Sequence, residues 1–313
     1  MYISQISAYI PENVVSNQYF EQINGLTEDW IVERTGIRER RKLSENENTN
    51  TLAIKAVEKL VEQRAFCPDL IVGGTYTPYD TIHTLAHSVQ NYLNISDIPV
   101  LSISTACSSF LNAMEVVEGY FASNKATNAL VVLADHNTFF SNDEDKVAGH
   151  LWGDGAVAML VSKEKPIHKA MRVLGIRTGG AGNIGKAKEG VFLRTYGEGF
   201  KMPFGKDVFL NACQYMAKAT KDLLSLHQYD IDEVDFFVPH QANLRITKNV
   251  AETLGLPFEK VLSNIEYLGN TGCAGSAIAL CEHFERFENQ NMIAVTVFGG
   301  GYSYGSMLLR VEI

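Results

Sequence analysis

Residues 100–110 read VLSISTACSSF and join two different patterns. The first four residues are typical of a buried strand, and the small residues after them indicate a sharp turn. Apolar residues then recur at helical spacing from Leu111 to Tyr120. The stretch therefore predicts a strand that turns directly into a helix, with Cys107 at the N-terminus of that helix.

A cysteine in this position is a candidate nucleophile. The partial positive charge at a helix N-terminus favours the thiolate, which is the form that attacks an electrophile. A free cysteine among small residues is also commonly a buried hydrophobic residue, so the stretch alone leaves both roles open. Cys273, in the sequence GNTGCAGS at 269–276, also precedes an expected helix and is a rival nucleophile. It ranks second because no clear strand leads into it.

Composition narrows the class of protein. The 313 residues are 46% hydrophobic, which is enough for a large core. Five cysteines without a C-x-x-C pair predict neither a disulfide framework nor a zinc site, and they fit a reducing, cytoplasmic setting. The net charge of −9 argues against nucleic-acid binding. The N-terminus does not resemble a signal peptide, and no apolar run is long enough for a membrane span, so we expect no membrane association.

Strands and helices alternate along the whole chain, which predicts a layered α/β architecture. The expected strands are 3–10, 70–72, 129–134, 156–161, 234–238, 292–298 and 306–311, and the expected helices are 27–36, 51–64, 83–94, 207–227, 244–254 and 275–287. The glycine- and lysine-rich segment 163–205 is expected to be less ordered, and the basic residues at 38–42 to form a solvated loop. Because residues 1–165 and 166–313 hold similar sets of elements, the sequence predicts two related halves.

A reactive cysteine needs a partner that moves a proton and donors that hold an oxyanion. His240 follows the apolar strand 234–238, at the end where open α/β sheets gather their ligand sites. Taken alone, it could equally be a structural histidine. Asn270, between glycine and threonine, is by itself typical of a turn.

Six short motifs in order resemble the β-ketoacyl-acyl-carrier-protein synthase III family of thiolase-like condensing enzymes. They are WIVERTGIRERR at 30–41, TACS at 105–108, GDGA at 153–156, HQANLR at 240–245, GNT at 269–271 and FGGG at 298–301. The match runs from end to end of the chain. It implies a five-layered α-β-α-β-α fold built from two related halves, and a homodimer.

The resemblance also implies a reaction and its residues, with Cys107, His240 and Asn270 as the catalytic group. Cys107 would take an acyl group from acyl-coenzyme A or acyl carrier protein, with the oxyanion held by the N–H groups of Cys107 and Gly300. His240 and Asn270 would then stabilise the enolate formed when a malonyl thioester loses carbon dioxide. The product would be a β-ketoacyl-carrier protein of fatty acid or related lipid or polyketide biosynthesis. The resemblance implies coenzyme A and phosphopantetheine thioesters as substrates, with no metal or other cofactor.

Substrate-binding positions carry over in the same way. Trp30 and Arg34 match positions that contact the adenine end of coenzyme A, and Phe298 begins the last motif. Arg245 matches a position that contacts acyl carrier protein. Because carrier protein is acidic, Arg245 and Lys248 would steer its approach.

Several positions depart from the usual family pattern. Residues 271–274 read TGCA where threonine, serine, alanine and alanine are typical, and Lys146 stands where many members bind coenzyme A with arginine. The stretch 76–83 also differs. These departures suggest a specialised paralogue, such as one that joins longer acyl chains in resorcinol-type lipid assembly. An acyltransferase to an alcohol or amine is the alternative activity on this fold, and a non-catalytic partner subunit is disfavoured because Cys107 and its helpers are all present.

Overall fold

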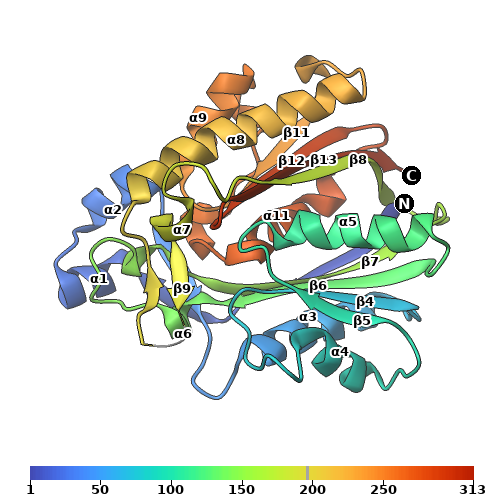
Figure 1. Ribbon diagram of the computed structural model, residues 1–313, viewed down its shortest axis with the longest axis horizontal. Coiled ribbons are helices and arrows are strands. Elements are labelled where there is room, and N and C mark those ends of the chain that lie inside the picture. Colours follow the sequence, from blue (N-terminus) through green and yellow to red (C-terminus); the bar gives the residue numbers. More distant parts are fainter. Residues whose placement is uncertain (195–196) are drawn as a thin grey trace.

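The computed structural model describes residues 1–194 and 197–313, and its elements stack in five layers, α-β-α-β-α (Figure 1). The helical layers contain α3 (Thr49–Gln63) and α4 (Leu85–Leu93), then α5 (Ser109–Ala122) and α11 (Gly275–His283), then α8 (Gly205–Leu226) and α9 (Leu244–Leu254). The strands between the first two helical layers are β1 (Tyr2–Tyr9), β4 (Leu70–Gly74), β5 (Val100–Ile103), β6 (Asn128–His136) and β7 (Asp154–Ser162). Those between the last two are β8 (Ala170–Gly180), β11 (Phe236–Pro239), β12 (Met292–Gly299) and β13 (Ser303–Glu312). The predicted five-layered fold is confirmed.

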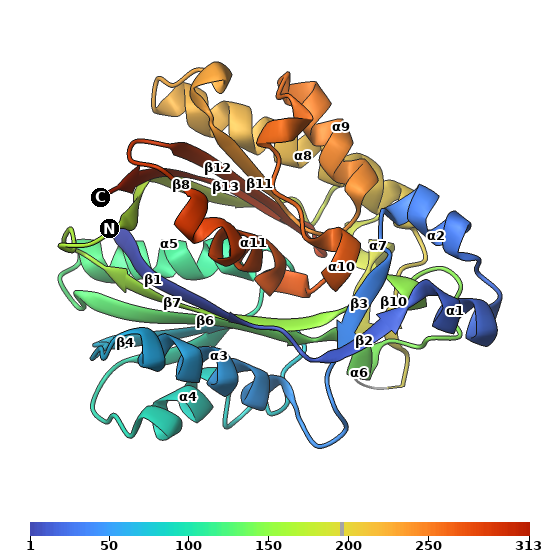
Figure 2. The same ribbon diagram turned by 180° about the vertical axis from the view of Figure 1, so that it is seen from behind.

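Hydrogen bonds connect these strands, within the described residues, in the order β11-β12-β13-β8-β1-β7-β6-β4-β5. β1 pairs with β7 along its length but with β8 only at Tyr2 and Ile3, so the two sheet layers join at one end. Figure 2 shows β1 beside β7 and both chain termini at that end. The expected boundary between 165 and 166 lies in the loop between β7 and β8. That the two halves are related stays a prediction.

Smaller elements gather at the opposite end of the molecule (Figures 1 and 2). They are β2 (Asn13–Ser16), α1 (Asn17–Asn24), α2 (Glu28–Thr35), β3 (Glu39–Lys42), α6 (Asn137–Phe140), α7 (Ala187–Gly190), β9 (Phe192–Arg194), β10 (Gly199–Lys201) and α10 (Ile265–Leu268). The start of α2 follows its sequence signal, since the Thr27 hydroxyl accepts from the Trp30 N–H. Gly36 ends the same helix at φ 80°, a left-handed conformation that favours glycine.

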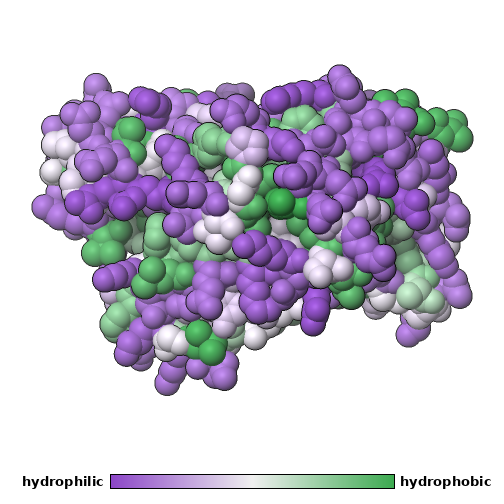
Figure 3. Space-filling model, turned by 90° about the horizontal axis from the view of Figure 1, so that it is seen from above, coloured by the Kyte–Doolittle hydropathy of each residue, from purple (hydrophilic) through white to green (hydrophobic). Residues whose placement is uncertain are grey.

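α5 lies between the two sheet layers and packs against both. Phe110, Leu111, Met114 and Val117 are all fully buried in the main core. Each such side chain contributes about 1.5–3 kcal/mol when it is removed from water. This burial holds the residues immediately before α5, including Cys107, in one place. Figure 3 looks onto the α8 and α9 face, where hydrophilic side chains predominate and hydrophobic patches lie apart from one another.

The structure corrects the expectation of a less ordered segment at 163–205. β8 lies inside the sheet, where it pairs with β13 along its whole length. Its sequence, AMRVLGIRTGG, mixes arginine and glycine with aliphatic residues, and non-local pairing outweighs that weak local signal. The expected segment also includes residues 195–196, which lie outside the described residues.

Two further expectations were wrong. The basic stretch 38–42 is not wholly solvated, because Arg40 in β3 is completely buried and donates to the carbonyl oxygens of Val15 (3.0 Å) and His150 (2.7 Å). Burial lowers the pKa of Arg40 to about 10, so it stays charged at neutral pH. The strand before Cys107 is β5, whose residues are only partly buried because β5 is an edge strand. None of the described helices has both the length and the apolar character needed to span a membrane.

Candidate active site

A cavity of about 330 Å³ brings together residues that are far apart in the sequence. Cys107, His240 and Asn270 all line it, together with Phe298 and Gly300. They come from the turn between β5 and α5, the end of β11, the end of α10 and the end of β12. The catalytic group and the oxyanion residues expected from the sequence therefore share one site.

Cys107 lies two residues before α5, in a turn that its neighbours hold. Ala106 adopts φ 52°, and the Thr105 N–H donates to the Ser109 hydroxyl at 2.9 Å. Cys107 is partly exposed and lines the cavity. Burial, with a smaller effect of the Asp135 carboxylate, raises the pKa of this thiol to about 12. This burial opposes the effect expected from the helix N-terminus, so a thiolate at Cys107 stays a prediction.

His240 is anchored through its backbone at the end of β11. Its N–H donates to the Thr296 carbonyl of β12 at 2.8 Å, and the residue is 5% exposed. Burial lowers the pKa of His240 to about 4, so the imidazole is neutral at pH 7. A neutral imidazole carries one N–H donor and one acceptor nitrogen, and it can therefore both donate to an oxyanion and accept a proton.

Three hydrogen bonds hold the backbone of Asn270. Its N–H donates to the Leu151 carbonyl at 2.8 Å, and its own carbonyl accepts from the Gly153 N–H (3.0 Å) and the Asn137 side-chain amide (3.2 Å). Its side-chain oxygen accepts from the Gly272 N–H at 3.0 Å. This orientation leaves the Nδ2 group as the part of the side chain that can donate to a ligand.

The end of β12 approaches the backbone of Cys107 very closely. A Cβ atom at Gly299 would lie 2.9 Å from the Cys107 nitrogen and 3.0 Å from the Ser108 nitrogen. Glycine is required here because any side chain would displace the N–H groups that can hold an oxyanion. The sequence pointed to Gly300 and missed Gly299, although both belong to the FGGG run and both line the cavity.

Four of the expected substrate-binding residues do not line this cavity: Trp30, Arg34, Lys146 and Arg245. The Arg34 guanidinium lies 4.6 Å from the centre of the Trp30 ring, and the Arg34 carbonyl accepts from Asn243, which does line the cavity. α2 therefore borders the cavity without entering it. Lys146 lines a neighbouring groove, and Arg245 is exposed on α9.

The rival Cys273 is enclosed. It is 2% exposed, its N–H donates to the Asp135 carboxylate at 2.8 Å, and its thiol donates to the Gly74 carbonyl at 3.4 Å. Burial also raises its pKa well above the ordinary value. Because Cys273 does not line the cavity, the structure favours Cys107 as the nucleophile.

The sequence missed two residues around Cys107. The Tyr76 hydroxyl lies 3.9 Å from the Cys107 sulfur and lines the cavity. Asp135, completely buried at the end of β6, accepts from the backbone N–H groups of Tyr76 (3.0 Å) and Cys273 (2.8 Å). In the sequence, only the departure of residues 76–83 from the family pattern pointed to Tyr76. No sequence feature pointed to Asp135.

Comparisons with known proteins agree with this site. The family model of 3-oxoacyl-(acyl-carrier-protein) synthase III matches residues 101–182, and the model of its C-terminal part matches residues 224–311. A β-ketoacyl-(acyl-carrier-protein) synthase III of Campylobacter jejuni is 33% identical, over 98% of this chain and 97% of its own.

Solved structures give the same result. The 3-oxoacyl-(acyl-carrier-protein) synthase III of Aquifex aeolicus superposes with a TM-score of 0.91 at 32% identity, over 99% of both chains. A priming β-ketosynthase of a polyketide pathway superposes with a TM-score of 0.88 at 25% identity, over 98% of this chain and 95% of its own. The fold and site define a thiolase-like condensing enzyme of the acyltransferase class. The chain belongs to the 3-oxoacyl-(acyl-carrier-protein) synthase III family, as its motifs predicted.

Proposed function

We propose that this enzyme condenses an acyl thioester with malonyl-acyl carrier protein through an acyl group carried on Cys107. The observation that supports this most strongly is the single cavity that Cys107, His240 and Asn270 share with the backbone of Gly299 and Gly300. A nucleophile, a neutral imidazole, an amide donor and backbone N–H groups are the parts that two-stage acyl transfer needs.

In the first stage the Cys107 sulfur attacks the carbonyl carbon of acyl-coenzyme A or acyl carrier protein. Because the Cys107 pKa is raised, the thiol proton must leave as the C–S bond forms, and we assign its acceptance to the neutral imidazole of His240. The backbone N–H of Cys107 and the Gly300 segment hold the oxyanion. The departing thiolate then takes the proton, which leaves an acyl-enzyme and a free thiol.

In the second stage the malonyl thioester enters and its terminal C–C bond breaks. Carbon dioxide leaves, and the electron pair forms an enolate whose oxygen accepts from the N–H of His240 and from Nδ2 of Asn270. The enolate carbon attacks the acyl carbonyl on Cys107, the C–S bond breaks, and the thiolate that leaves takes a proton from water. The product is the β-ketoacyl thioester.

We propose that no metal or other cofactor takes part, because loss of carbon dioxide generates the carbanion and the residues above hold its charge. Activity should therefore be the same before and after dialysis of the protein against EDTA. A loss that added metal restores would contradict this proposal.

Residues outside the cavity are candidates for binding the carriers of the acyl and malonyl groups. We propose that Trp30, Arg34 and Lys146 bind the nucleotide end of coenzyme A, and that Arg245 and Lys248 on α9 meet acyl carrier protein. Both α9 residues are exposed, and the related synthases are named for acyl carrier protein. Charge reversal at Arg245 should raise KM for the carrier-protein substrate about tenfold at low salt and much less at high salt, with kcat retained.

A homodimer is the assembly that we propose, with β5 at its interface. β5 is an edge strand, and the loop before α4 exposes Tyr79 (67%) and Ile82 (88%), which are unusually exposed for apolar side chains. Sedimentation equilibrium should give twice the chain mass, and Ile82→Asp should lower the measured mass.

We also propose a cytoplasmic location. The five free cysteines support this location, and cell fractionation tests it.

Intact-mass measurement of the protein with a panel of acyl donors, followed by malonyl-acyl carrier protein, tests the main proposal. The expected result is an acyl adduct on Cys107 that is discharged with release of carbon dioxide. Discharge to an alcohol or amine without carbon dioxide would instead establish the alternative acyltransferase activity.

A further inference from the structure

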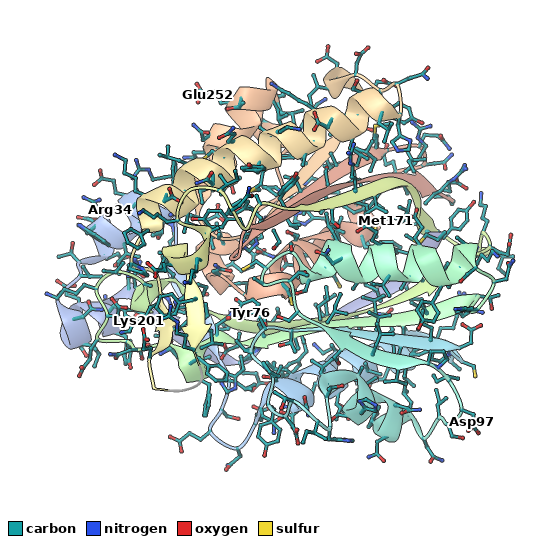
Figure 4. The ribbon with its side chains drawn as sticks, viewed as in Figure 1. Arg34, Tyr76, Asp97, Met171, Lys201 and Glu252 are labelled. Atoms are coloured by element: carbon teal, nitrogen blue, oxygen red, sulfur yellow. The ribbon has the colours of Figure 1, made fainter. Side chains whose placement is uncertain are left out.

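Tyr76 lines the cavity beside the sulfur of Cys107. Figure 4 shows Tyr76 in the interior of the molecule, whereas Arg34 and Lys201 lie nearer its edge. Its hydroxyl is 3.9 Å from the Cys107 sulfur and 2.7 Å from the Asn137 side-chain oxygen. No step of the reaction described above uses this hydroxyl.

Asn137 sets the direction of that hydroxyl. Its Nδ2 group donates to the carbonyl oxygens of Gly153 (2.9 Å) and Asn270 (3.2 Å), so its Oδ1 must face Tyr76. In the resting enzyme the Tyr76 hydroxyl donates to Asn137 and can accept the Cys107 thiol hydrogen. Once the thiol proton has left, rotation about the C–O bond turns the same hydroxyl into a donor to the sulfur.

The space for this hydroxyl exists because residue 272 has no side chain. A Cβ atom at Gly272 would lie 2.7 Å from the Tyr76 oxygen and 2.2 Å from the Asp135 carboxylate, and Gly272 also adopts φ +65°. The Tyr76 backbone is tied to the same carboxylate, since its N–H donates to Asp135 at 3.0 Å. The position of the tyrosine is therefore determined at both its backbone and its hydroxyl.

Three aromatic rings pack together in the cavity wall that Tyr76 belongs to. The Tyr76 and Phe200 rings meet edge to face with centres 6.1 Å apart, and the Phe200 and Trp152 rings are 4.1 Å apart. All three residues line the cavity, and they pack with the small elements around α1 and α2. An acyl chain that extends inward from the Cys107 sulfur would meet these rings.

We propose that Tyr76 is a specificity-determining and positioning residue of the condensing site: its ring limits the acyl group on Cys107 to short chains, and its hydroxyl hydrogen-bonds the sulfur. This inference rests on the proposed acyl-Cys107 intermediate and names the residue that limits the length of its acyl chain. A limit to short acyl chains argues against the longer acyl chains of a resorcinol-type pathway.

The experiment compares the wild type with Tyr76→Ala, Tyr76→Phe and, as a matched surface control, Tyr92→Phe. Each protein is offered acetyl, butyryl, octanoyl and dodecanoyl thioesters, and kcat and KM of the first stage are measured separately by intact mass. We expect the wild type to prefer acetyl and butyryl by about tenfold or more over dodecanoyl. Tyr76→Ala should reverse or abolish that preference, whereas Tyr76→Phe and Tyr92→Phe should keep it.

The hydroxyl is tested by alkylation of Cys107 with iodoacetamide at several pH values. The titratable groups around Cys107 are Tyr76, Asp135, Cys273 and His240, and Tyr76→Phe changes only one of them. Loss of one hydrogen bond to the sulfur should slow alkylation about three- to tenfold at each pH, with no change in Tyr92→Phe.

Two results would overturn the inference. One is a wild type that loads dodecanoyl as well as acetyl, and the other is a Tyr76→Ala variant with the chain-length profile of the wild type. Either can occur while Cys107 still forms adducts that malonyl-acyl carrier protein discharges. Failure of the proposed function is different, because then no donor gives an adduct on Cys107 at all.

Discussion

Two loops of this enzyme each present a cysteine just before a helix, yet only one of the two cysteines lines the cavity. The nucleophile loop, residues 104–108, precedes α5 and places Cys107 in the cavity wall. The asparagine loop, residues 269–274, leads into α11, and its Cys273 is 2% exposed. It contributes Asn270 to the cavity instead. The difference shows that access to substrate, and not position before a helix, separates a nucleophile from a packing residue.

One carboxylate connects the surroundings of both loops. Asp135 accepts from the hydroxyls of Thr75 and Thr77 at 2.9 Å each and from the Cys273 N–H at 2.8 Å. It therefore fixes the Tyr76 segment beside the nucleophile loop and the start of α11 at once. The following predictions test the division of roles between the two loops.

The largest difference in activity should come from replacing each of the two cysteines in turn. Cys107→Ser should lower acyl-enzyme formation and condensation by about a thousandfold or more, because the hydroxyl is a far weaker nucleophile. Cys273→Ala should keep both within severalfold of the wild type. Intact mass and carbon dioxide release measure the two steps. An adduct that persists in Cys107→Ser and disappears in Cys273→Ala would reverse the roles of the loops.

Asn270→Ala should lower condensation about a hundred- to a thousandfold, since a donor to the enolate oxygen is lost. Acylation of Cys107 should stay within severalfold, because this loop does not hold the first oxyanion. Single-turnover measurements of each stage separate the two effects, and Asn249→Ala on the exposed face of α9 serves as the control. Equal losses in both stages would argue against this assignment.

Alkylation should distinguish the cysteines by access and by pH. Because the pKa of Cys107 is raised to about 12, its thiolate fraction and its alkylation rate should increase about tenfold for each pH unit between pH 7 and 10. Cys273 should stay unlabelled until the protein unfolds. Peptide mapping after iodoacetamide treatment measures both sites. A rate for Cys107 that levels off below pH 9 would show an active thiolate in the resting enzyme.

Asp135→Ala should lower the free energy of unfolding by about 2–4 kcal/mol, because several buried donors lose their acceptor. The loss should also expose Cys273 to alkylation and so weaken the contrast between the loops. Urea denaturation measures the stability. Asp222→Ala, which removes an exposed ion pair with Lys218, should cost less than about 0.5 kcal/mol. Similar values for the two variants would mean that Asp135 does not hold the loops.

Local sequence signals predicted those elements whose residues decide their own conformation. α9 begins and ends where its periodicity indicated, Leu244–Leu254, and α2 lies between its Thr27 cap and Gly36. β8 was missed because its strand character comes from pairing with β13 and not from its own residues. Arg40 was misplaced because nothing in a run of basic residues tells which one faces inward.

The sequence by itself determined the layered α/β order, the family, and the three residues proposed for catalysis, because periodicity, caps and short motifs are written in neighbouring positions. The tertiary structure alone decided which cysteine meets the cavity, that Tyr76 stands beside the sulfur, and that the Cys107 pKa is raised and the His240 pKa lowered. These properties depend on desolvation and close approach between segments far apart in the chain, which no local pattern records.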